Sequence, residues 1–195
     1  WAGLSGNFGE VRYGRQDSVP FQTMIGYDFN GAANAASALG WSGAAPWGSD
    51  FTRQTQSLQY ISPNMNGFTV QVGFAGKEDG VADAKSATSA ALTYAAGKFS
   101  VSVAGQTEGV RGGESLAAVA GSYDFDVVKV MAGYADGVFG GNNKGPTVGF
   151  VAPVAGFNVG MHYGKNTETK DGATEFFINR EIFKNTFAYL DYGRV

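Results

Sequence analysis

The feature that most constrains the fold of this chain is an alternation of apolar and polar residues, in segments of about ten residues, along most of its length. In one such segment Phe99, Val101 and Val103 alternate with Ser100 and Ser102. A period of two residues is that of a β-strand with one face in apolar and the other in polar surroundings. The pattern therefore predicts an all-β chain, and segments with a helical period are hard to find.

The connections between these segments alternate between short turns and longer polar loops. This succession is typical of transmembrane antiparallel β-barrels, which have tight turns at one end and larger loops at the other. The expected long loops are 16–52, 78–84, 108–114, 137–144 and 166–172. We expect about twelve strands, with the bounds 1–5, 9–15, 53–62, 68–77, 85–96, 98–107, 115–123, 127–136, 145–153, 156–165, 173–182 and 186–194.

Composition agrees with a barrel and excludes several other classes of protein. Charged residues make up only 16% of the chain, against roughly 25% in soluble domains. A mean hydropathy of -0.12 is compatible with strands that face lipid on one side and water on the other. A net charge of -3 gives no basic surface for nucleic acid, and the absence of cysteine excludes disulfides and thiolate sites.

Aromatic residues flank the expected short turns, and the alternation directs most of them outward. A ring of aromatic side chains at one height is typical of the membrane–water interface of a barrel. A soluble β-sandwich core is the alternative, although it gives no reason to place aromatics beside every short turn. The pairs are Tyr60 and Phe68, Tyr94 and Phe99, Phe150 and Phe157, and Phe183 and Phe187.

Residues 16–52 interrupt the rhythm of strands and turns. The stretch contains Phe21, Met24, Tyr27 and Trp41, and is too apolar to be disordered. A loop of this length is usually functional. Folded into a wide barrel, it would narrow the channel; displayed outward, it would offer a binding surface.

Two motifs on either side of this stretch resemble those of a known family. Residues 4–15 (LSGNFGEVRYGR) resemble the strand–turn–strand before the constricting loop of the Gram-negative general porins, particularly those of β-proteobacteria. Residues 60–68 (YISPNMNGF) resemble a hairpin of the same family. The resemblance implies a 16-stranded barrel with an aqueous channel. Residues 1–195 would then be one partial barrel domain that lacks the first three strands and the last. A closed twelve-stranded barrel, with 1–5 paired to 186–194, is the alternative.

The resemblance also implies what the chain does. We expect an integral outer-membrane porin, a homotrimer surrounded by outer-membrane lipid and lipopolysaccharide, that lets ions and small hydrophilic solutes diffuse passively. No enzymatic activity and no cofactor are expected. The alternative function is that of an adhesin or receptor that works through its surface loops.

The expected functional residues are charges at the narrowest point of the channel. The alternation places Arg53 in the lumen together with Gln59, and directs Arg12 and Lys129 inward as well. Arginines on the wall that face carboxylates on the loop create a transverse field, which orients dipolar solutes and selects ions. The alternative is that they are ordinary solvated charges.

The resemblance supports some of these residues and adds two. Arg53 matches the constriction arginine of the family, and Asp28 matches an acidic position of its loop, with Asp50 as a weaker candidate. Gln59 is a departure, because related sequences often have a basic residue at that position. One positive charge of the constriction is therefore expected to be missing.

His162 is the only histidine, and no cysteine or acidic residue stands near it at a metal-ligand spacing. Its position in the alternation favours a polar residue that lines the lumen over one member of a Ser–His catalytic pair. On the strand 173–182 the inward face is ambiguous, because Glu175 and Phe177 alternate with Phe176 and Arg180. We expect Arg180 to extend along the lipid boundary.

Overall fold

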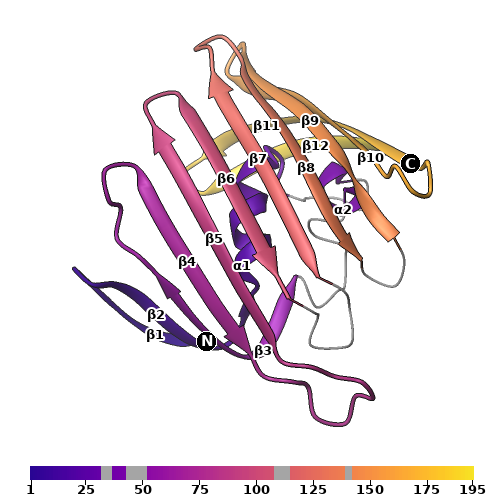
Figure 1. Ribbon diagram of the computed structural model, residues 1–195. Coiled ribbons are helices and arrows are strands. Elements are labelled where there is room, and N and C mark those ends of the chain that lie inside the picture. Colours follow the sequence, from indigo (N-terminus) through magenta and orange to yellow (C-terminus); the bar gives the residue numbers. More distant parts are fainter. Residues whose placement is uncertain (32–36, 43–51, 108–114, 139–141) are drawn as a thin grey trace.

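A computed structural model describes residues 1–31, 37–42, 52–107, 115–138 and 142–195. Twelve strands form one antiparallel sheet in which neighbours in the chain are neighbours in space (Figure 1). The predicted all-β fold with about twelve strands is therefore confirmed. The strands are β1 (Ala2–Gly6), β2 (Gly9–Asp17), β3 (Arg53–Ile61), β4 (Phe68–Ala75), β5 (Ala87–Ala96), β6 (Phe99–Gln106), β7 (Leu116–Asp124), β8 (Lys129–Val138), β9 (Asn142–Val154), β10 (Phe157–Lys165), β11 (Gly172–Phe183) and β12 (Thr186–Arg194).

The predicted loop 137–144 is largely strand. β8 and β9 continue their pairing up to Val138 and Asn142, which leaves only 139–141 outside the described residues. Asp136 stands directly opposite Lys144 in this extension, and opposite charges stabilise a cross-strand pair. The polar residues 142–144 therefore continue β9 instead of forming part of a loop.

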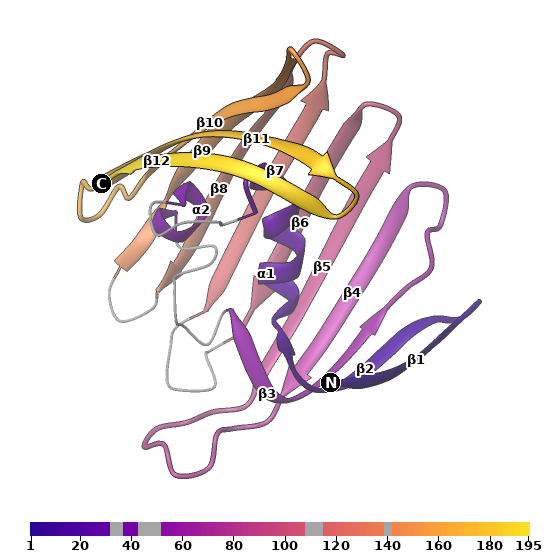
Figure 2. The ribbon, with the colours of Figure 1, turned by 180° about the vertical axis from the view of Figure 1, so that it is seen from behind.

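The sheet curves strongly (Figure 2). Its two faces have opposite chemistry. The convex face is apolar and exposed, whereas the concave face carries small and polar side chains. This arrangement is the reverse of a soluble protein, in which the apolar face is buried, and it is typical of a barrel with lipid outside and water inside. Exposed apolar residues include Leu58, Val72, Leu92, Val103, Val119 and Val148. Buried polar residues include Ser57, Gln59, Ser89, Ser102, Gln106, Ser122 and Thr147.

Aromatic side chains at the short turns lie on the convex side, as the sequence predicts. Phe68 is exposed and stacks against Tyr94 with 4.6 Å between ring centroids. The turn between β9 and β10 shows why these connections are so tight. Ala155 and Gly156 have φ of 51° and 80°, and two consecutive positive φ angles are the geometry of a two-residue hairpin turn.

The long insertion contains short helices that the sequence analysis did not predict. The first, α1 (Val19–Met24), is followed by the 3₁₀ turn η1 (Ile25–Tyr27), and α2 (Ala38–Trp41) comes later. The Ser18 hydroxyl accepts the Phe21 N–H at 3.2 Å, and Pro20 occupies the first turn of α1; both features favour a helix start. Within the described ranges, no helix has the length and apolar character needed to cross a membrane.

The sheet has two open edges in the described part of the chain. There, β1 pairs only with β2, and β12 pairs only with β11. The alternative of a twelve-stranded barrel closed by these two strands is therefore not formed.

Candidate functional site

The concave face of the sheet holds a segment that we call the inner segment, defined as residues 18–31 and 37–42. In it, α1 lies against β5, β6 and β7, while α2 lies against β9, β10 and β11 (Figure 2). Its apolar side chains pack on alanines of the wall, whose small size leaves room for them. The cluster includes Val19, Met24, Tyr27 and Leu39 from the segment, and Ala91, Ala104, Ala118, Ala120, Met131 and Ala135 from the wall.

Polar contacts hold the middle of the inner segment to the same wall. The Tyr27 hydroxyl lies 2.9 Å from Ser100 Oγ and 2.7 Å from Ser102 Oγ. Tyr27 is 4% exposed, so its hydroxyl would lack any partner without these two serines. The segment is thus a fixed part of the interior, in contact with wall residues more than seventy positions away in the sequence.

One end of the inner segment is fixed by what we call the β2–β3 anchor, formed by Arg12, Gln22 and Gln59. Gln22 Nε2 donates to Gln59 Oε1 at 2.7 Å and to the Asp17 carbonyl at 2.6 Å. Gln59 Nε2 donates to the same carbonyl at 2.7 Å. Arg12 adds a bond from Nη1 to Gln22 Oε1 at 3.2 Å. This anchor is built from neutral amides and one guanidinium.

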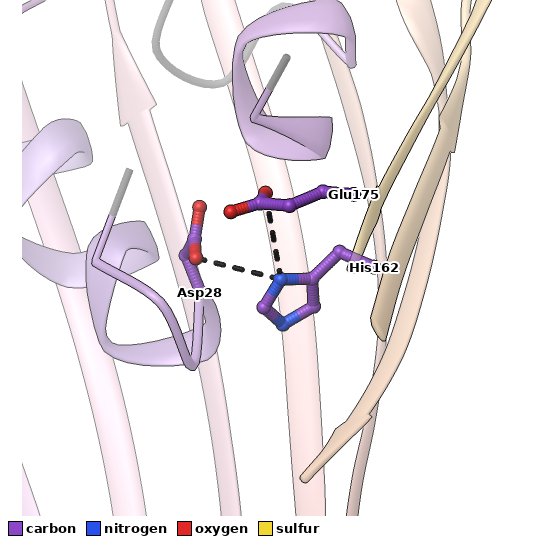
Figure 3. Close-up of side chains that lie close together, drawn as sticks. All are labelled: Asp28, His162 and Glu175. Atoms are coloured by element: carbon purple, nitrogen blue, oxygen red, sulfur yellow. Dashed lines mark ion pairs between the residues drawn. The ribbon is translucent and has the colours of Figure 1, made fainter. Parts of the chain in front are cut away.

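The middle of the inner segment is also fixed by what we call the β10–β11 anchor, formed by Asp28, Asn30, His162 and Glu175. Figure 3 shows three of these side chains, Asp28, His162 and Glu175. The Phe29 N–H donates to His162 Nε2 at 3.1 Å. Asn30 Nδ2 donates to Glu175 Oε1 at 2.6 Å. Asp28, His162 and Glu175 are all buried. Three of the four residues of this anchor are therefore buried ionisable groups.

Two of the predicted site residues face the concave side as the alternation predicts. Arg12 is bound to Gln22 of the inner segment, and its guanidinium also pairs with Glu10 at 2.7 Å. Lys129 Nζ lies 5.1 Å from the centre of the Phe29 ring, which belongs to the inner segment. Both cations are only half-buried, so each keeps part of its charge accessible to water.

Arg53 is not where the alternation predicts it. Gln56 has a φ of 50°, and the pairing of β2 with β3 shifts between Gly14 and Gln16. Such an irregularity inserts an extra residue and changes the phase of the alternation. The next side chain on the concave face is therefore Gln54, which donates to the inward Gln106 at 2.9 Å. Arg53 is exposed and pairs with Asp17 at 3.1 Å.

The remaining predicted residues are placed as follows. Gln59 is 1% exposed, because the inner segment covers it, so it holds the segment rather than contacts open space. Asp28 turns toward the wall at β10 and β11, where its Oδ2 accepts from Ser37 Oγ at 2.8 Å. Asp50 lies outside the described residues. On β11, the strand whose inward face was ambiguous in the sequence, Glu175 and Phe177 point inward. Arg180 points outward, with its Cζ 5.2 Å from the centre of the exposed Phe157 ring.

The grouping of Asp28, His162 and Glu175 was missed by the sequence analysis. Nδ1 of the histidine and one oxygen from each carboxylate lie within 4.8 Å of one another. Asp28 lies more than a hundred positions before His162 and Glu175 in the sequence. No spacing of residues in the sequence therefore indicates the contact. An imidazole between two carboxylates can share a proton with them or bind a divalent cation.

Solved structures with the same fold include porins and other outer-membrane proteins. An anion-selective porin from Comamonas acidovorans is 24% identical, with a TM-score of 0.77 over 98% of this chain and 64% of that one. OmpT of Vibrio cholerae is 17% identical, with a TM-score of 0.69 over 98% and 67%. A mutant of the Rh. blastica porin is 13% identical, with a TM-score of 0.79 over 98% and 70%.

This chain thus spans about two thirds of the length of these three solved proteins. No curated protein matches it by sequence. The family model of the Gram-negative porins matches residues 1–195. The strand order, the reversed polarity of the two faces and this match lead to one conclusion: the chain belongs to the Gram-negative porin family, whose members are integral to the outer membrane.

Proposed function

We propose that this chain forms the wall and the constriction of a passive diffusion channel for ions and small hydrophilic solutes. The observation that carries the proposal is the inner segment, which lies on the polar concave face rather than on the convex one. An inward segment narrows a channel, whereas a receptor or adhesin would display its longest insertion outward. Family membership supports assembly as a homotrimer within outer-membrane lipid and lipopolysaccharide.

The proposed constriction has charged residues with different tasks. Arg12 and Lys129 present half-buried cations on the concave face. Arg12 and Arg53 contribute less than Lys129, because Glu10 pairs with the first at 2.7 Å and Asp17 with the second at 3.1 Å. The proposal gives Gln59 and Asp28 the task of holding the inner segment in place. Asp50 remains a candidate carboxylate of the same loop.

The direct test is single-channel recording of the native protein in planar lipid bilayers. A diffusion channel gives stable current steps that are proportional to voltage, and a trimer gives them in groups of three. Pure, folded protein that produces no channels at any concentration would contradict the proposal.

The charge of the constriction is tested by reversal potentials in a salt gradient with Lys129→Gln. One unit charge at ~4 Å in water is worth ~1 kcal/mol, so the ratio of anion to cation permeability should fall about two- to fivefold. Lys98→Gln is the matched control, because Lys98 lies in a short turn and pairs there with Asp126. Equal ratios in both variants would remove Lys129 from the constriction.

A further inference from the structure

His162 occupies a slot in the wall that glycine makes possible. The ring is 2% exposed and lies between the rings of Phe29 and Phe177, with centroids 5.6 Å and 5.4 Å away. Gly149 stands opposite it on β9, and a Cβ there would come within 2.1 Å of His162 Cδ2. No side chain at position 149 is compatible with the ring in this place. The wall is therefore shaped to hold the imidazole in one orientation.

The two nitrogens of this ring have different neighbours. Nε2 accepts the Phe29 N–H at 3.1 Å. A ring nitrogen that accepts a hydrogen bond carries no proton, so in the neutral imidazole the proton is on Nδ1. Nδ1 lies 3.5 Å from Asp28 Oδ1 and 3.8 Å from Glu175 Oε2 (Figure 3). The backbone contact thus fixes the tautomer, and the tautomer directs a proton toward two carboxylates.

The charged groups around the ring come from four elements. Asp28 belongs to the inner segment, and Glu175 to β11. Asp191 on β12 is linked to them, because Asn30 Nδ2 donates to it at 3.1 Å as well as to Glu175. Lys129 on β8 lies beyond the Phe29 ring. Carboxylates that lie this close together need hydrogen-bond donors nearby. A proton on His162 Nδ1 is such a donor, and it is directed at Asp28 and Glu175.

A metal ion fits this arrangement less well than a proton. A cation bound at Nδ1 would displace the proton from that nitrogen, and a metal-binding histidine normally keeps its proton on the other nitrogen. That proton would then point at the Phe29 N–H, a donor facing a donor. The observed contact at Nε2 therefore favours a protonated Nδ1 over a metal at the same atom.

We propose that His162 is a positioning residue of the channel, and that its Nδ1–H tautomer fixes the inner segment against β10 and β11. The ring binds the segment at the Phe29 N–H through Nε2. Its Nδ1 faces the neighbouring Asp28 carboxylate at 3.5 Å and has no hydrogen-bond partner among the described residues. This proposal rests on the proposed function, since it explains how the segment that narrows the channel is kept in place.

The tautomer is measured by nitrogen NMR of the native protein labelled with ¹⁵N-histidine in detergent micelles. The signal of His162 is the one lost in His162→Gln. We expect the one-bond coupling to a proton at Nδ1 and an unprotonated Nε2. A proton on Nε2 instead, or a shift of the Nδ1 signal on adding stoichiometric Zn²⁺, would overturn the proposal, the second in favour of a metal site.

The two contacts of the ring are separated by matched substitutions. In His162→Gln the amide reaches the position of Nε2, so its oxygen can accept from Phe29. In His162→Asn the shorter amide reaches only the position of Nδ1. His162→Phe keeps the volume of the ring and loses both contacts. We expect hydrogen exchange at the Phe29 amide to stay slow in the Gln variant, and to become about tenfold faster in the Asn and Phe variants.

Equal exchange rates in all three variants would contradict the positioning role. Heat-modifiable electrophoretic mobility shows whether each variant is a folded barrel, and only folded protein is compared. The outcome is independent of the proposed function, because neither the tautomer nor the exchange rate requires an open channel. A confirmed tautomer in a protein that forms no channels would contradict the diffusion channel alone.

Discussion

Two parts of the inner segment, one at Gln22 and one at residues 28–30, are held by chemically different anchors. The β2–β3 anchor uses amide–amide and amide–carbonyl hydrogen bonds, with the half-exposed Arg12 at its margin. The β10–β11 anchor buries a histidine beside two carboxylates, in a slot that the absence of a side chain at Gly149 leaves open. The first has redundant neutral bonds that tolerate the loss of one partner. The second depends on the shape of the slot and on the position of one proton.

The largest expected effect comes from closing the slot of the β10–β11 anchor with Gly149→Ala. The new methyl group would overlap His162 Cδ2 at 2.1 Å, and overpacking of this kind costs about 1–3 kcal/mol in the free energy of unfolding. Urea unfolding followed by tryptophan fluorescence measures the loss.

Gly105→Ala is the matched control for this substitution. Gly105 also lies within a strand, but a Cβ there meets nothing closer than the Leu116 carbonyl at 3.4 Å. We expect a change within about 0.5 kcal/mol. If Gly149→Ala and Gly105→Ala lower the free energy of unfolding equally, the fit of the His162 ring against Gly149 is not a specific feature of the β10–β11 anchor.

A smaller effect is expected at the β2–β3 anchor from Gln59→Leu. The buried amide is lost, but Gln22 Nε2 keeps its bond to the Asp17 carbonyl, so no strong donor is left without a partner. We expect a loss of about 1 kcal/mol, the net value of a typical hydrogen bond. Gln71→Leu is the control, because Gln71 Oε1 is buried without a hydrogen-bond partner among the described residues. A greater loss at Gln71 than at Gln59 would contradict the assignment of this anchor.

The smallest expected effect on stability concerns Glu168, in the loop between β10 and β11. The hydrogen bond from Lys144, at 2.8 Å, and then the charge of the lysine lower the pKa of the Glu168 carboxyl. A carboxyl with a lowered pKa adds stability above its unfolded pKa, and that contribution disappears as the pH falls through the folded pKa. Both groups are at the surface, so the contribution is small.

Lys144→Met should return the pKa of Glu168 toward its ordinary value, as measured by NMR titration of its carboxyl carbon. Lys170→Met is the control, because the charge of Lys170 is the weakest influence on this carboxyl. An unchanged pKa in the Lys144 variant would show that the ion pair does not form in solution.

The sequence predicts the strands well and the anchors poorly, for physical reasons. The alternation is a local property, so it finds twelve strands and directs Arg12 and Lys129 inward. It fails at Arg53, because a positive φ at Gln56 changes the phase of β3, and a glutamine carries no signal for such a bulge. The strand extension at Lys144 is missed because its partner Asp136 is recognised only once the register is known.

The β10–β11 anchor lies outside what one sequence can predict. His162 has no metal-ligand spacing in the chain, yet the fold brings Asp28 and Glu175 to it from two other elements. Asp28 looks like a channel carboxylate when only its loop is considered. It turns to the wall because His162 and the Ser37 hydroxyl are there to receive it. The register of β10 against β11 brings His162 beside Glu175, and the path of the inner segment brings Asp28 to them.

The central claim is that the inner segment borders the path of the ions, and Gly26→Cys tests it most directly. Gly26 is exposed in η1, a Cβ there meets nothing within 4 Å, and these 195 residues contain no other cysteine. A bulky, negatively charged thiol reagent added to an open channel should lower the current of each step, whereas Ala90→Cys on the convex face should show no change. Full modification of Gly26→Cys, verified by mass spectrometry, with an unchanged current would contradict the account.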